Sequence, residues 1–188
     1  MFYITQNNKL LNYADTKYSE KCKFTDIITQ NELTLSPNKV IVVNDELILN
    51  PDFEEEELLK AKQEKYNEAN NKARDYLESG DALYPFVQNN VLYHIEATDG
   101  NIAKIGLKAT SLLIVQDFET TFPWNTQEDI TINLNALEGK NIAEGLGAIQ
   151  DEVWTVKFPL YVSKIEEAQT IEEVKAINID YTTNFEEI

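Results

Sequence analysis

The chain has 188 residues, 43% of them hydrophobic, which is enough to bury a core in one domain or in two small ones. Its 33 acidic and 16 basic residues give a formal net charge of −17, and a surface this acidic repels phosphate backbones and anionic lipid. No run approaches the roughly 18 apolar residues that a membrane helix needs. We therefore expect a soluble protein made in the cytoplasm, without a nucleic-acid partner and without membrane insertion.

Residues 1–50 are rich in β-forming side chains and are broken by Asn and Asp. Residues 2–5 and 9–13 flank the turn sequence Gln6-Asn7-Asn8 and predict a β-hairpin. A second hairpin is predicted from residues 40–43 and 47–49. Its first strand is continuously apolar, so we expect at least part of this module to be covered on both faces. We interpret residues 1–50 as a β-rich N-terminal attachment module.

A polar helix is predicted over residues 53–79. Asn50 or Asp52 can cap it, the acids at 54–57 suit the positive end of its dipole, and Gly80 ends it. The apolar side chains of this helix form only a narrow stripe, which is typical of a solvated connector between modules or of one strand of a coiled coil. We favour the connector for residues 51–80, because the stripe uses Ala and Tyr, which are poor seam residues. Its members are Leu59, Tyr66, Ala69, Ala73, Tyr76 and Leu77.

Residues 81–188 alternate hairpins with helices, so we predict an α+β fold. Residues 84–87 and 91–96 form one predicted hairpin, and residues 122–125 and 130–133 form another. Between them, Thr98-Asp99-Gly100 ends a strand and caps a helix. The helix carries a core-facing stripe made of Ile102, Ile105, Ala109, Leu112 and Leu113.

A long amphipathic helix follows the second of these hairpins. Asn133 or Asn135 opens it, and Pro159 lies inside the pattern, where it should kink the helix or break it in two. Thr170 and Glu173 then fit a capping box for a short final helix. The apolar face of the long helix is predicted from Leu146, Ile149, Val153, Val156 and Leu160.

No grouping of residues points to catalysis, a metal or a cofactor. His94 is the only histidine and Cys22 the only cysteine, so neither a disulfide nor a Cys/His zinc site can be built. The glycines at 139, 145 and 147 lie in a helical pattern, where they predict close packing or local flexibility rather than a phosphate loop. The paired acids lie at helix starts or on polar faces. We expect a non-enzymatic protein.

Aromatic side chains are the best candidates for partner contacts, because they offer a large contact area at low entropic cost. We select Trp124, Phe122, Tyr66 and Tyr76 as candidate partner-docking residues. Trp154 and Phe158 are instead predicted to lie in the core.

The second half of the chain resembles a family of domains from small proteins of phage and prophage tail gene clusters. The resemblance is carried by Trp124-Asn125-Thr126 with the strand Ile130-Thr131-Ile132, by the long helix, and by the restart Thr170-Ile171-Glu172-Glu173. It covers most of residues 40–181, and residues 1–39 match nothing in it. It implies an α+β C-terminal domain in a tail-fibre or tail-fibre-assembly protein.

This resemblance implies a structural adaptor in or near the baseplate or tail fibre, and tail parts repeat around an axis, so a homo-oligomer is expected. The N-terminal module and the polar helix would carry attachment, while the C-terminal module would face outward or cap a fibre. Such a protein belongs to the virion tail after cytoplasmic synthesis. One alternative is a cytoplasmic fibre-assembly chaperone that is absent from the mature particle. Another is an acidic inhibitor that mimics DNA.

Overall fold

The computed structural model describes residues 2–6, 9–14, 23–24, 40–43 and 46–183. Its helices and small antiparallel hairpins confirm the predicted α+β class. The chain divides into two compact units, residues 1–60 and 61–188, which we describe separately. Cys22 and the turn residues at 7–8 and 44–45 lie outside the described residues.

The first unit contains one antiparallel sheet of order β3-β1-β2-β4-β5. Both predicted hairpins are present, and pairing between Lys9 and Ile41 joins them into one sheet. Val40 of this sheet is buried. The strands are β1 (Phe2–Gln6), β2 (Lys9–Ala14), β3 (Lys23–Phe24), β4 (Val40–Val43) and β5 (Glu46–Leu49).

Helix α1 (Phe53–Glu78) has the predicted bounds to within one residue. At its start the side chain of Asn50 accepts a hydrogen bond from the backbone N–H of Asp52 at 3.1 Å. Three acids occupy the first turn, where the positive end of the helix dipole favours them. Gly80, with φ of +88°, takes the left-handed conformation that ends the helix.

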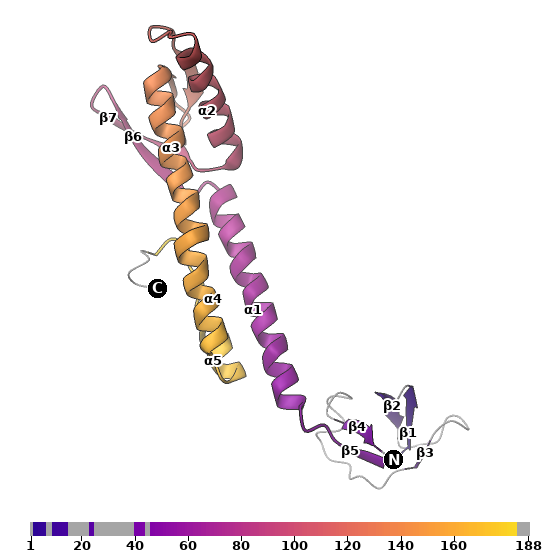
Figure 1. The fold of residues 1–188 in the computed structure, drawn as a ribbon. Helices are drawn as coiled ribbons and strands as arrows, with labels where there is room; N and C mark the ends of the chain where they lie inside the picture. Colours follow the sequence, from indigo (N-terminus) through magenta and orange to yellow (C-terminus); the bar gives the residue numbers. More distant parts are fainter. Residues whose placement is uncertain (1, 7–8, 15–22, 25–39, 44–45, 184–188) are drawn as a thin grey trace. The chain divides into compact units, whose positions relative to one another are not determined.

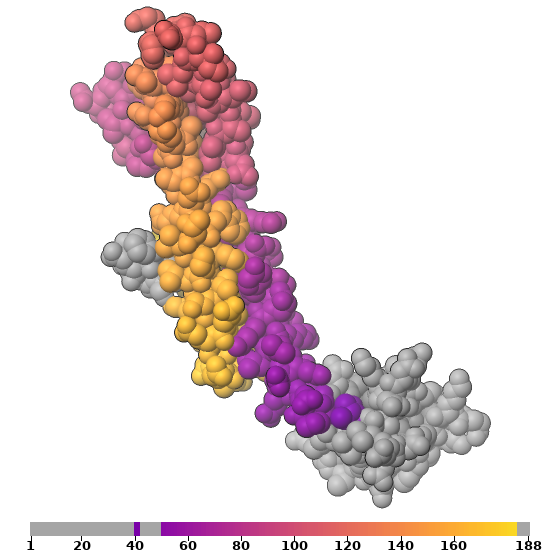
Figure 2. Space-filling view, in the orientation of Figure 1, coloured from indigo at the N-terminus to yellow at the C-terminus, as the bar shows by residue number. Residues whose placement is uncertain are grey.

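The second half of α1 is a core element of the second unit. Ala69, Ala73 and Leu77 are buried against the rest of that unit, while the other stripe residues Leu59 and Tyr66 are 60% and 40% exposed. Figure 2 shows α4 and α5, in yellow, directly against α1, in purple. Over residues 69–77 the stripe that predicted a solvated connector or a coiled-coil seam is therefore covered by the same chain.

Two separate hairpins are described in the second unit. Strands β6 (Leu83–Gln88) and β7 (Val91–Glu96) are joined through Asn89 and Asn90, whose φ angles of 54° and 63° suit a two-residue hairpin turn. Strands β8 (Phe122–Asn125) and β9 (Thr131–Leu134) form the second hairpin. Both confirm the sequence prediction.

Helices α2 (Asp99–Ile114) and α3 (Ala136–Glu152) pack together beside these hairpins (Figure 1). Thr98 caps α2, and Asn135 and Glu138 form a capping box on α3. Ile105 and Ala109 of α2 are fully buried, as predicted. Gly139 and Gly145 lie where α3 meets the rings of Phe122 and Tyr84, whereas no atom lies within 4 Å of a Cβ placed on Gly147.

A π-helical segment, η2 (Val153–Lys157), separates α3 from α4 (Phe158–Glu167). Here the backbone N–H of Phe158 bonds the carbonyl of Val153, five residues back, and Pro159 follows at the start of α4. A π turn holds an extra residue, so it advances the buried face by one position. Val156 and Leu160 are therefore exposed, contrary to prediction, and Lys157 and Tyr161 take their places inside.

The described chain ends in a short helix and a returning segment. Helix α5 (Ile171–Ala176) begins with the predicted capping box of Thr170 and Glu173. The segment that follows buries Ile179 and Tyr181 in the core. The segment is tied to α1 by the hydrogen bond from the Tyr181 hydroxyl to the carbonyl of Ala69.

Candidate protein-docking site

A surface groove of about 510 Å³ lies between α2 and β8 in the second unit. Residues 123–127 line it without a gap. Because side chains alternate between the faces of a strand, this unbroken lining means that the groove follows the edge of β8. Among the described strands β8 pairs only with β9. The groove is lined by Glu96, Asn101, Lys104, Lys108, Pro123, Trp124, Asn125, Thr126 and Gln127.

Two lysines of α2 form the other wall of this groove. Lys104 and Lys108 are one helical turn apart and share a side with Asn101. Both lysines are exposed, and no described carboxylate lies within ion-pair distance of either ammonium. The groove therefore holds two lysines without a described carboxylate in ion-pair distance, together with one acid, Glu96, on a chain of net charge −17.

Trp124 forms the aromatic part of the groove. Its side chain is half-buried and packs against the core, and the ammonium of Lys108 lies 5.9 Å from the centre of its ring. The indole N–H is buried and has no acceptor among the described residues. A buried donor of this kind costs stability unless a partner supplies an acceptor.

Hydrogen bonds hold the base of the groove in place. The side-chain amide of Asn101 donates to the carbonyl of Glu96 at 3.1 Å. The backbone N–H of Gln127 donates to the carbonyl of His94 at 2.9 Å, which ties the turn after β8 to β7. A groove fixed in this way loses little conformational entropy when a partner binds.

Exposed apolar side chains cluster at the end of α2 next to the groove. Leu107, Ile114 and Val115 are 71%, 75% and 69% exposed, and Phe118 is 50% exposed. These four residues, which we call the α2 apolar end, are close in sequence and follow one another along the helix and its exit turn. Exposed apolar side chains grouped along one helix in this way are typical of an interaction surface.

The four predicted docking residues are not brought together. Phe122 is buried in the core with only 7% of its surface exposed, although it lies two residues from Trp124. Tyr66 packs edge-on against Phe158 at 5.4 Å between ring centres. Tyr76 stacks on Tyr181 at 6.3 Å. Of the four, only Trp124 lines the groove.

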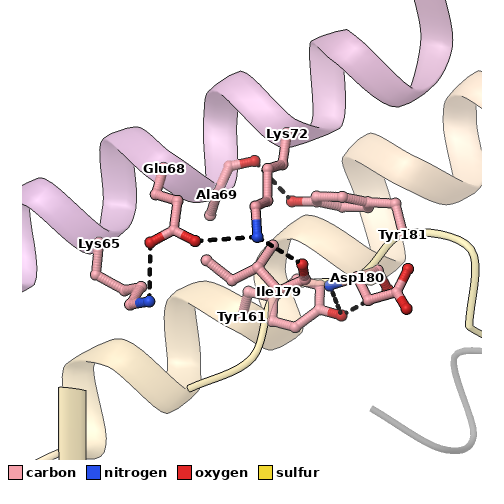
Figure 3. Close-up of polar contacts among 8 residues, drawn as sticks. All are labelled: Lys65, Glu68, Ala69, Lys72, Tyr161, Ile179, Asp180 and Tyr181. Carbon is pink, nitrogen blue, oxygen red and sulfur yellow. Dashed lines mark hydrogen bonds and ion pairs between the residues drawn. The ribbon is translucent and has the colours of Figure 1, made fainter. Parts of the chain in front are cut away.

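Beside the stacked pair of Tyr76 and Tyr181, polar contacts from α1 and α4 form a clamp on the returning segment, part of which Figure 3 shows. The ammonium of Lys72 donates to the carbonyl of Ile179 at 3.1 Å, and the hydroxyl of Tyr181 donates to the carbonyl of Ala69 at 3.1 Å. Tyr161 adds a third tie by donating to the carbonyl of Asp180 at 2.8 Å. The clamp is structural, since its side chains hold main-chain groups.

Burial and charge pairing shift several pKa values in this clamp. The nearby ammonium of Lys65, at 2.8 Å, lowers the pKa of Glu68. Burial raises the pKa of Tyr181, and burial together with the charge of Glu152 raises the pKa of Tyr76. Each shift favours the protonation state that the clamp uses at neutral pH.

His94 pairs with Glu128 across the two hairpins. Its Nδ1 lies 2.7 Å from the Glu128 carboxylate, and this hydrogen bond lowers the pKa of Glu128 to about 2. Within the described residues no three His, Cys, Asp or Glu side chains are placed to hold a metal ion. In the same part of the chain, no helix combines the length and apolar character that crossing a membrane requires.

Sequence reasoning missed Lys104 and Lys108. A signal for them exists: between Asp99 and Asp117 the chain has no acidic residue and has these two lysines one turn apart. Their proximity to Trp124 could not be inferred, because it depends on how α2 and β8 pack.

Comparison with known proteins adds no relative to this description. No protein-family model, no curated protein and no solved structure matches the chain.

Proposed function

We propose that this chain is a non-enzymatic, tail-associated structural protein of a phage or prophage, an adaptor that docks on other tail or fibre proteins. The order of hairpin, long helix and capped restart that resembles tail-protein domains supports the setting. The α2 apolar end supports the mode of action, and it is the observation that carries the proposal.

Four large apolar side chains at least half exposed in one short stretch are costly for a chain that works alone. Leu107 and Ile114 lie two turns apart on the outer side of α2, and Val115 and Phe118 continue the patch into the exit turn. Burying such side chains releases about 25 cal/mol per Å² of apolar surface. A partner that covers the α2 apolar end therefore gains affinity directly.

The rigidity of the second unit also suits an adaptor. Side-chain caps fix the starts of α2, α3 and α5, and close contacts at Gly139 and Gly145 lock α3 in place. A preordered surface binds without a large entropic cost. In a tail, several copies would present this surface around the symmetry axis.

The test is the composition of purified particles from an infected or induced host, measured by mass spectrometry. We expect the chain in washed particles, in a fixed ratio to the major tail proteins. A chain found with fibre protein in the lysate but missing from particles would favour the assembly chaperone instead. Light scattering of the purified chain gives the copy number in solution.

A further inference from the structure

We propose that the groove between α2 and β8 binds an extended acidic peptide segment of a protein partner. Carboxylates of the segment pair with Lys104 and Lys108, and its main chain runs along the edge of β8. This inference rests on the proposed docking function and names the chemistry of the partner.

Charge is the first argument. Lys104 and Lys108 line the groove without an ionic partner among the described residues, and the helix that carries them has no acid after Asp99. Glu96 also lines the groove, but its carboxylate lies against Gly80, with Oε1 3.1 Å from where a Cβ on that glycine would stand. The two ammonium groups are therefore left to attract carboxylates.

The edge of β8 is the second argument. An exposed strand edge can accept an extended peptide as a further strand, with main-chain hydrogen bonds for affinity and side-chain contacts for specificity. The groove follows this edge over residues 123–125, where β9 is the only described strand paired with β8, and continues along the turn residues 126 and 127. Pro123 has no N–H, and the N–H groups of Thr126 and Gln127 already donate to the carbonyls of Ile130 and His94. Backbone donors for pairing along the groove are therefore confined to residues 124 and 125.

Trp124 is the third argument. Its ring offers an apolar and aromatic wall, and its indole N–H lacks an acceptor among the described residues. Because the indole nitrogen is buried in the free chain, a carbonyl or carboxylate of the bound segment would reach it only if the indole turned toward the groove. Val115, 69% exposed, lies on the same side of α2 as the groove lysines and extends the apolar surface for a neighbouring side chain.

The experiment uses the full chain, ¹⁵N-labelled, and three octapeptides that differ only in charge. Each peptide alternates Phe with a polar residue: Glu in the first, Gln in the second and Lys in the third. The chain has two indole N–H signals, from Trp124 in the groove and from Trp154 outside it. Trp154 is thus an internal control for binding elsewhere.

We expect the Glu peptide to shift the Trp124 indole signal, to leave that of Trp154 in place, and to bind roughly five- to tenfold more tightly than the Gln peptide at low salt. The double variant Lys104→Gln with Lys108→Gln should lose this preference. Lys140→Gln with Lys175→Gln removes the same charge from other exposed sites and should keep it. Both double variants change exposed side chains, and circular dichroism checks their folding.

Several results would overturn the proposal. Equal binding of the Glu and Gln peptides, or a shift confined to Trp154, removes the groove as an acidic-peptide site. Free glutamate that reproduces the effect at equal carboxylate concentration means small-anion binding only. If the free chain is a dimer whose mass falls when the peptide is added, the groove is occupied by a second copy of this chain and not by a different protein. Particle composition is unaffected by all of these, so a failure here leaves the tail setting standing.

Discussion

Individual side chains determine how closely the helices of the second unit can approach. A Cβ at Gly145 would overlap the ring of Tyr84, whereas one at Gly147, on the same helix, would meet nothing. The two positions are a matched pair, because both substitutions to Ala gain helix propensity and only one creates a clash.

We predict that Gly147→Ala stabilises the second unit by up to about 1 kcal/mol and that Gly145→Ala destabilises it by about 1–2 kcal/mol net. Urea unfolding followed by tryptophan fluorescence measures both, since Trp124 and Trp154 lie in that unit. Equal effects at the two positions would mean that α3 does not pack on Tyr84 as described.

Lys157 is a buried cation with defined partners. Its ammonium donates to the carbonyl of Tyr181 at 2.9 Å and lies 3.3 Å from Glu152. Lys157→Met keeps the aliphatic stem but leaves the carbonyl without its donor, so we expect a loss of about 1–2 kcal/mol in the free energy of unfolding. Lys140→Met, which removes the exposed pair with Glu144, should change it by less than about 0.5 kcal/mol. If Lys157→Met leaves the free energy of unfolding unchanged, the returning segment is held without this hydrogen bond.

The pair of His94 and Glu128 predicts a pH effect of known sign. The hydrogen bond between these two side chains lowers the pKa of Glu128 from 4.5 to about 2. The stability contributed by the ionised Glu128 carboxylate is therefore complete above pH 4.5 and is lost as the pH falls toward 2. His94→Val should return the pKa of Glu128 toward 4.5 in a carboxylate NMR titration. The pKa of Asp117, lowered by a hydrogen bond with Thr120, should not move. If the pKa of Glu128 is unchanged in His94→Val, the pairing is contradicted.

At the scale of elements, the turn between α3 and α4 decides which residues are buried. Buried side chains follow one another in steps of four residues, at Val153, Lys157, Tyr161 and Ile165. In a regular α-helix, side chains at this spacing would move progressively around the helix. The extra residue in the π turn of η2 keeps them on the buried face. Deleting the exposed Val156 should restore a regular helix with the same buried set. Pro159 would then stand inside that helix, at a cost of about 3 kcal/mol.

We therefore predict that deletion of Val156 destabilises the second unit and that adding Pro159→Ala to the deletion recovers most of the loss. Thermal unfolding of the two variants beside wild type measures this. If Pro159→Ala gives no recovery in the deleted chain, proline is not what the π turn accommodates.

Local signals in the sequence predicted the elements well, and for a physical reason. Hairpins and caps depend on residues a few positions apart, as with Asn89 and Asn90 or Thr170 and Glu173, so their order along the chain suffices. The cover on Ala69 and Ala73 could not be predicted, because it comes from a segment more than a hundred residues away that bonds α1 through Tyr181. Aromatic content singled out Trp124 for the docking site, but the lysines across the groove from it depended on packing.

At the scale of the whole molecule, we propose a protein that acts by docking on partners. The α2 apolar end and the neighbouring groove lie on one unit, and the caps and glycine contacts of that unit keep them in shape. A tail adaptor needs such a surface on each copy, because partners in a tail are met repeatedly around an axis.

The most direct test is incorporation of variants into particles, measured by quantitative mass spectrometry in a host that supplies the chain in trans. Ile114→Asp with Val115→Asp places charge on two side chains that are 75% and 69% exposed, so the fold should survive while docking fails. Leu160→Asp, at a side chain that is 38% exposed on α4, is the control. We predict that the wild-type and control chains are present in a fixed ratio to the tail proteins and that the double variant is depleted by about tenfold or more. Absence of the wild-type chain from particles, or equal incorporation of the double variant, would contradict it.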